Sequence, residues 1–173
     1  MAIALAQEDT PKIIQYARYR LIDNFRAKYD YYQLLKNTIA PENWKTFLEE
    51  IIQEVSTTKD RWRSAQLIEK IYINEQWWDR LFVLLKQCIS LERIKNYEEY
   101  LAEDYAQELI QLYKKQLLPY VDGFMGREHY QKACQYLRRM KKLGGEEQVE
   151  KLVTFFKTKY SNRRALLDEL SKL

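Results

Sequence analysis

His129 and Cys134 are the residues whose types and spacing come nearest to a reactive or metal-binding pair. His129 is the only histidine in the chain of 173 residues, and histidine is the usual proton carrier near neutral pH. It stands beside Glu128 at an expected helix start, where a solvated or capping role is more typical than general-base catalysis. Together with Cys134 it supplies two ligands, whereas a closed zinc site usually needs four. The pattern therefore predicts no metal site, no cofactor and no enzymatic activity.

A second set of residues with binding chemistry is cationic and lies near the end of the chain. From Gly126 to Leu173 there are 12 Lys and Arg against 6 Asp and Glu, within a chain of net charge +4. Such side chains contact the phosphates of nucleic acids. Without a motif that reads bases, we expect binding to be weak and salt-sensitive, with dissociation constants of about 10⁻⁴ to 10⁻⁶ M at physiological salt. The candidate contacts are Lys132, Arg138, Arg139, Lys142, Lys157, Lys159, Arg163 and Arg164.

The same cations have a structural explanation. Cations in the last turn of a helix stabilise the carbonyl end of its dipole. On a helix from Tyr130 to Leu143, the expected core residues are Tyr130, Ala133, Leu137 and Met140, and Lys132, Arg139 and Lys142 fall on the other side. A left-handed cap at Gly144-Gly145 should close this helix. Stability and solubility therefore account for part of the charge, and nucleic-acid binding stays an alternative.

The composition predicts that these residues stand on helices. Hydrophobic residues make up 46% of the chain, and 4 Gly and 3 Pro are too few for the frequent tight turns of most all-β folds. Helices are expected from Thr10-Pro11, from Pro41, after Thr57 with Asp60, and around Trp78. After a charged connector from Glu92 to Tyr97, a helix with Tyr105 should end before Pro119, and three more should follow the loop VDGFMG. The expected core residues of the first and third helices are Ile14, Ala17, Leu21 and Phe25, and Trp62, Ala65, Ile68 and Tyr72.

The spacing of the aromatic residues favours a repeat. Trp44 and Trp78 are 34 residues apart, the length of a tetratricopeptide-type helix pair, although the full consensus is missing. We expect one domain over residues 1–173, built as antiparallel helix-pair repeats. Its final helix, from about Asn162, should cover Leu152 and Phe156 at the end of the stack. A compact helix bundle is the alternative.

Several features predict a cytoplasmic protein. No apolar run approaches the roughly 18 residues of a membrane-spanning helix, and the first residues do not resemble a signal peptide. Cys88 and Cys134 each stand at an apolar helical position, so both are expected to be reduced core residues.

The stretch GREHYQKACQYLRRMKKLGGEEQVEKLVTFFKTKYSNRRALLDEL resembles the C-terminal helical region of bacterial SWIM zinc-finger proteins. The likeness covers Gly126 to Leu173 and is carried by the GR-x-HY-x-x-A start, the basic LRR-x-KKL run and the closing RRALLDEL segment. It implies a helical arm of a larger cytoplasmic protein with links to DNA or protein binding. The CxC…CxH zinc ligands of the family are missing, so the resemblance implies no functional residue here.

These observations lead to two functional hypotheses. A stack of helix pairs forms a concave groove that can hold a peptide or a helix, which favours a protein-interaction scaffold with an unidentified partner. The basic C-terminal region favours a weak, non-specific nucleic-acid-binding arm. A groove with exposed aromatic residues would favour the first hypothesis, and a continuous cationic stripe would favour the second.

Overall fold

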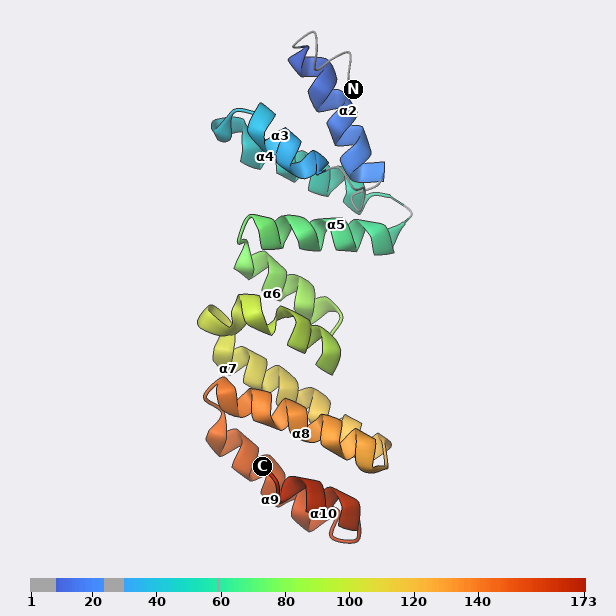
Figure 1. The fold of residues 1–173 in the computed structure, drawn as a ribbon, viewed down its shortest axis with the longest axis vertical. Coiled ribbons are helices and arrows are strands. Elements are labelled where there is room, and N and C mark those ends of the chain that lie inside the picture. The colour runs from blue at the N-terminus through green and yellow to red at the C-terminus, as the bar shows by residue number, and fades with distance from the viewer. Residues whose placement is uncertain (1–8, 24–29, 59) are drawn as a thin grey trace. The chain divides into compact units, whose positions relative to one another are not determined.

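The computed structural model describes residues 9–23, 30–58 and 60–173, and every regular element among them is an α-helix (Figure 1). The prediction of an all-α protein is thus confirmed for these residues. They fall into two compact units, Met1–Gln76 and Trp77–Leu173, called unit 1 and unit 2 below. None of the described helices is both long enough and apolar enough to cross a membrane.

Unit 1 contains four described helices, two of which begin at an aspartate cap. The helices are α2 (Thr10–Asp23), α3 (Tyr31–Thr38), α4 (Pro41–Ser56) and α5 (Arg61–Asn74). The carboxylate of Asp30 accepts a hydrogen bond from the backbone nitrogen of Gln33 at the start of α3, and Asp60 does the same for Arg63 in α5. Asp60 rather than Thr57 therefore caps α5. Within the unit, α2 packs on α3 and α4 packs on α5.

The buried faces of α2 and α5 differ from the predicted ones. Ser64 Oγ donates a hydrogen bond of 2.6 Å to the backbone oxygen of Val55, and this bond turns the Ser64 face of α5 toward α4. Trp62, expected in the core, is consequently 66% exposed. Both faces of α5 carry apolar residues, so periodicity alone could not choose between them. In α2 the buried residues are Ile13, Ala17 and Leu21, so Ile14 was predicted wrongly, and Phe25 lies outside the described residues. In α5 the buried residues are Ser64, Leu67 and Ile71, and the predicted core residues Ala65, Ile68 and Tyr72 are not fully buried.

Glu75, at the end of α5, links the stability of unit 1 to pH. Its carboxylate accepts hydrogen bonds from Tyr32 Oη and from Lys36 Nζ, the latter at 2.7 Å. Burial alone would raise the pKa of this carboxyl, but Lys36 and Tyr32 hold the pKa below its ordinary value of 4.5. Because the folded-state pKa is the lower one, the stabilisation is complete above the unfolded value and is lost as pH falls through the folded value.

We therefore expect Glu75→Gln to flatten the decline in stability of unit 1 on acidification below about pH 4.5. Urea midpoints followed by hydrogen exchange in α4 and α5 would measure it. Glu69→Gln, on the same helix, is the control and should keep the native slope. Equal slopes for the native chain and Glu75→Gln would contradict the assignment.

Unit 2 contains a helix that folds back on itself. Its elements are α6 (Trp78–Gln87), α7 (Leu91–Gly123), α8 (Arg127–Lys142), α9 (Glu146–Lys159) and α10 (Arg164–Leu170). The backbone of α7 leaves helical geometry at Tyr105, where φ is −127° and ψ is 26°. Tyr113 Oη then donates a hydrogen bond of 2.6 Å to Glu98, a residue that would lie about 22 Å away along a straight helix. The two arms of α7, residues 91–104 and 106–123, therefore form a hairpin (Figure 1).

The hairpin corrects two predictions. The charged segment from Glu92 to Tyr97 is helical rather than a connector, because Leu91, Ile94 and Tyr97 form a buried stripe. Pro119 lies inside α7 and does not end it, since the second arm continues to Gly123. The expected loop VDGFMG is correspondingly shorter and begins only at Phe124.

Helix α8 is the centre of unit 2 and packs against α7, α9 and α10. Its predicted core residues are confirmed, since Tyr130, Ala133, Leu137 and Met140 are all buried. The predicted glycine cap is also present. Gly144 has a φ of +87°, and the nitrogen of Gly145 donates to the backbone oxygen of Met140 at 2.9 Å. A Cβ on Gly145 would lie only 2.9 Å from the same oxygen, so both glycines are required for different reasons.

Helix α10 differs from the predicted closing helix in its start and in its main packing partner. It begins at Arg164, after Arg163 at the N-cap position, rather than from about Asn162. Leu166 and Leu170 of α10 are buried. The helix packs chiefly on α8, whereas the prediction placed it over Leu152 and Phe156 of α9. The side chain of Glu169 is also buried, and it binds Arg127 at 3.3 Å and Lys172 at 3.0 Å.

The two cysteines have different environments. Cys134 is buried in α8 as predicted, whereas Cys88 is exposed at the C-terminal cap of α6, so its assignment to the core was wrong. The register of α6 explains the error, because the helix ends at Gln87 and the stripe does not continue to the next residue.

Candidate functional site

The eight cations predicted to contact nucleic acid all lie in unit 2, but most of them bind the protein itself. Lys132, Arg138, Arg139 and Lys142 stand on α8, Lys157 and Lys159 on α9, and Arg163 and Arg164 at the start of α10. Their partners, described next, decide which of them a phosphate could reach.

Three of these cations hold α7 in place. Arg139 forms an ion pair of 3.0 Å with Glu98 on the first arm, and Lys159 forms one of 3.3 Å with Asp122 on the second. Arg163 donates to the backbone oxygen of Val121 at 2.6 Å, at the end of the second arm where carbonyl groups lack helical partners. These contacts fasten α8, the end of α9 and the start of α10 to the two arms of α7.

The remaining cations divide into bound and free side chains. Arg138 donates to the backbone oxygen of Lys172 at 3.3 Å, and Lys132 lies 3.9 Å from Glu92. Lys142, Lys157 and Arg164 are exposed and have no hydrogen-bond or ionic partner in the described part of the chain. The sequence therefore identified a real surplus of charge, but the structure leaves only part of it available to a ligand.

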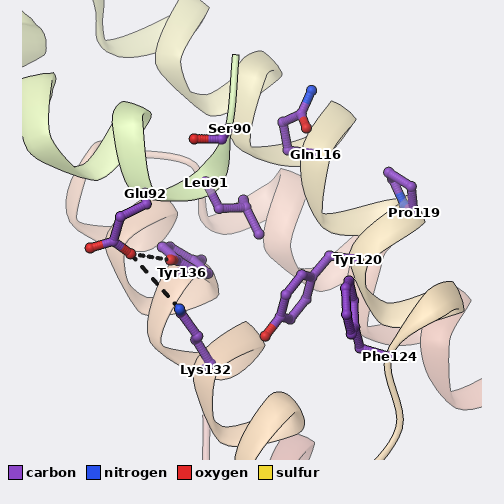
Figure 2. A pocket seen from close by; sticks show the side chains of 9 residues that line it. All are labelled: Ser90, Leu91, Glu92, Gln116, Pro119, Tyr120, Phe124, Lys132 and Tyr136. Carbon is purple, nitrogen blue, oxygen red and sulfur yellow. Dashed lines mark hydrogen bonds and ion pairs between the residues drawn. The ribbon is translucent and has the colours of Figure 1, made fainter. Parts of the chain in front are cut away.

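A pocket of about 370 Å³ lies between the ends of α7 and the first half of α8 (Figure 2). The start of the first arm, the last turns of the second arm and α8 each contribute to it. Leu91 lies near the middle of the view, between Gln116 above and the rings of Tyr136 and Tyr120 below (Figure 2). The lining residues are Ser90, Leu91, Glu92, Gln116, Pro119, Tyr120, Phe124, Lys132 and Tyr136.

The local sequence explains how the pocket is held open. Ser90 Oγ accepts a hydrogen bond of 3.2 Å from the backbone nitrogen of Arg93, which fixes the start of α7 at one edge. On the opposite side, Tyr120 Oη lies 3.0 Å from Nδ1 of His129. The ring of Phe124 stacks on the same imidazole, with centroids 5.1 Å apart. The histidine that sequence analysis treated as a capping residue thus positions two aromatic walls.

One edge of the pocket is a small polar cluster around Glu92. Its carboxylate accepts hydrogen bonds from Tyr136 Oη at 3.0 Å and from Lys95 Nζ at 3.1 Å. The bond from Lys95, followed by that from Tyr136, lowers the pKa of Glu92, so this carboxyl is ionised near neutral pH. Burial, and then the neighbouring carboxylate, raises the pKa of Tyr136, which therefore keeps its proton.

An exposed apolar surface continues from the pocket into the loop after α7. Phe124 is 49% exposed and the next residue, Met125, is 70% exposed. Large apolar side chains that remain in water next to a concave site are typical of binding surfaces. The pocket and these two residues form the candidate site.

Sequence analysis missed this site because its residues come from three separated segments. The hairpin of α7 brings Leu91 near Tyr120, and no local pattern predicts that fold. The one feature of the sequence that points to the site is the short stretch at the end of α7 that combines Pro119, Tyr120 and Phe124.

The pocket combines aromatic walls with one polar edge. In the described residues, no three His, Cys, Asp or Glu side chains are grouped so that they could hold a metal ion. Tyr136 donates a hydrogen bond to Glu92 at one edge of the pocket, and the ammonium group of Lys132 lies 3.9 Å from the same carboxylate. No family model matches the sequence, and no curated protein or solved structure matches it either.

Proposed function

We propose that the chain is a non-catalytic helical scaffold that binds a protein partner, and that the pocket between α7 and α8 receives a side chain of that partner. The observation that carries the proposal is an aromatic-walled pocket beside exposed apolar residues. Protein interfaces are typically anchored by an apolar or aromatic side chain seated in such a pocket. The volume of about 370 Å³ is at the small end of the range for ligand sites and suits one or two side chains.

The architecture of unit 2 supports this role. From α6 to α9, consecutive helices pack against each other and are joined by short connections, which is the construction of helical-repeat scaffolds. We propose that these helix pairs are degenerate, tetratricopeptide-like repeats. The resemblance of Gly126–Leu173 to the C-terminal region of SWIM zinc-finger proteins supports the further proposal that the chain acts as a cytoplasmic interaction arm.

Nucleic-acid binding by the basic region is the second candidate. The exposed, unpartnered side chains of Lys142, Lys157 and Arg164 favour it. The ionic bonds of Arg139 and Lys159 and the hydrogen bonds of Arg163 count against it, because a phosphate would have to displace contacts that hold α7. Protein binding is therefore the better-supported function.

Selection from an unbiased library of displayed peptides tests the proposal. We expect the native chain to enrich peptides, and we expect Gln116→Trp to lose them because an indole would fill the pocket. Gln111→Trp is the matched control, since it adds the same side chain at an exposed position of the same arm that does not line the pocket. Blocking one anchor should weaken binding at least about tenfold, which is the usual effect of removing a hot-spot contact.

Circular dichroism should first show that both tryptophan variants keep the helical content of the native chain. Peptides that bind Gln116→Trp as tightly as Gln111→Trp would show that the pocket is not the site. The absence of any enriched peptide would contradict the protein-binding function.

A further inference from the structure

One edge of the pocket contains a carboxylate that is shared between two lysine side chains. Glu92 contributes a single carboxylate there, whereas two ammonium groups approach it, those of Lys95 and Lys132. Lys95 binds Glu92 Oε1 at 3.1 Å, and Tyr136 donates to Oε2 at 3.0 Å. Lys132 is left at 3.9 Å from Oε2, beyond hydrogen-bond distance.

Lys132 is therefore the available cation of the site. Its side chain is 52% exposed and reaches the pocket from α8, on the side where Tyr120 also points (Figure 2). A loose pair of this kind contributes little to stability, so an external carboxylate could take the ammonium without a large cost to the fold. The apolar wall and the available cation lie in the same pocket.

We infer that the partner segment is an acidic peptide, in which an apolar anchor residue enters the pocket and a neighbouring Asp or Glu binds Lys132. This inference rests on the proposed function and names the chemistry of its partner. The anchor would contact Leu91, Tyr120 and Phe124, while the carboxylate of the peptide would bind the ammonium group of Lys132. Such charge complementarity chiefly selects among partners and speeds encounter.

The alternative occupant, a nucleic-acid strand, fits the geometry less well. A strand needs a row of cations that follows its phosphates beside the rings on which its bases stack. The free cations Lys142, Lys157 and Arg164 do not line the pocket, and among the described residues Lys132 is the only cation that does. The wider region still attracts acidic ligands, since residues 77–173 contain 18 Lys and Arg against 14 Asp and Glu.

Two biased peptide libraries test the inference. Both fix an aromatic or leucine residue at the centre; one allows Asp, Glu, Ser and Gly at the flanks, and the other allows Lys, Arg, Ser and Gly. We expect enrichment from the acidic library only. Lys132→Glu should weaken the binding of the selected acidic peptides by about fivefold to thirtyfold, because a weak attraction is replaced by a repulsion of similar size.

Charge exchange supplies the decisive control. A peptide in which the acidic residue is changed to Lys should recover affinity for the Lys132→Glu variant. Lys142→Glu makes the same change at an exposed position of α8 outside the pocket, and it should leave the affinity for the acidic peptides nearly unchanged. Equal enrichment from both libraries would overturn the inference and leave the proposed function intact. No enrichment from either library would contradict the proposed function itself. Displacement of the acidic peptide by an equimolar single-stranded oligothymidylate would overturn the inference in favour of nucleic acid.

Discussion

Removal of residues 164–173 is expected to convert Cys134 from a protected thiol into a rapidly reacting one. In the intact chain Cys134 is buried in α8, and burial raises its pKa to about 11, so the thiolate that reacts with disulfide reagents is scarce. Helix α10 packs on α8, the helix that carries Cys134. Without α10, the side chain should reach water and its rate of reaction should rise on the order of a hundredfold.

Reaction with 5,5′-dithiobis(2-nitrobenzoic acid) measures this directly, because the exposed Cys88 provides an internal standard. The native chain should show one fast and one slow thiol, and the truncated chain two fast ones. Leu166→Ala with Leu170→Ala, which keeps the length of the chain, should give an intermediate rate for Cys134. A slow second thiol after truncation would show that α10 does not cover α8.

The second large effect is expected from Tyr113→Ala. Tyr113 is 0% exposed, and its ring packs against that of Tyr136 with centroids 5.8 Å apart. Truncation of a fully buried aromatic side chain costs about 3 to 5 kcal/mol. It would also remove the hydrogen bond to Glu98 that joins the two arms of α7. We expect the melting temperature of the chain to fall by roughly 6 to 20 °C, at about 2 to 4 °C for each kcal/mol in a chain of this size.

Tyr113→Phe separates packing from hydrogen bonding. The ring would remain, and Glu98 would still bind Arg139 at 3.0 Å, so the loss should be only about 1 kcal/mol. Hydrogen exchange in α7 and α8 would assign the loss to unit 2. Equal destabilisation by the two variants would mean that the hydrogen bond, and not the ring, holds the hairpin.

The features that could be predicted from sequence are those set by local geometry. The stripe from Tyr130 to Met140 and the cap at Gly144 follow from helical spacing and from the conformational freedom of glycine, so both were predicted correctly. The face of α5 could not be predicted, because it depends on the bond between Ser64 and Val55, which joins two helices.

The hairpin of α7 could not be predicted from the local sequence either, because it also depends on contacts between helices. Tyr105 leaves helical geometry where its hydroxyl binds Asp79 and its ring stacks on Phe82 with centroids 4.3 Å apart. Both partners lie on α6, so the break depends on tertiary contacts. The pocket depends on that break. Its residues could therefore be recognised only after the fold was known.

The sequence alone also could not show which cations are already paired within the protein. Sequence analysis correctly located a surplus of positive charge but could not show that Arg139 binds Glu98 or that Lys159 binds Asp122. Glu98 and Asp122 stand 41 and 37 residues before their partners in the chain, and only the fold brings them to α8 and α9.

Amide chemical-shift mapping with a library-selected peptide is the measurement that tests the central claim most directly. A titration of the labelled chain would report every backbone amide that changes on binding. We predict that the largest changes fall at residues 90–92, 116–124 and 132–136, around the pocket of unit 2. Changes centred instead on Lys142, Lys157 and Arg164, with the pocket amides unmoved, would contradict the account and place binding on the basic surface.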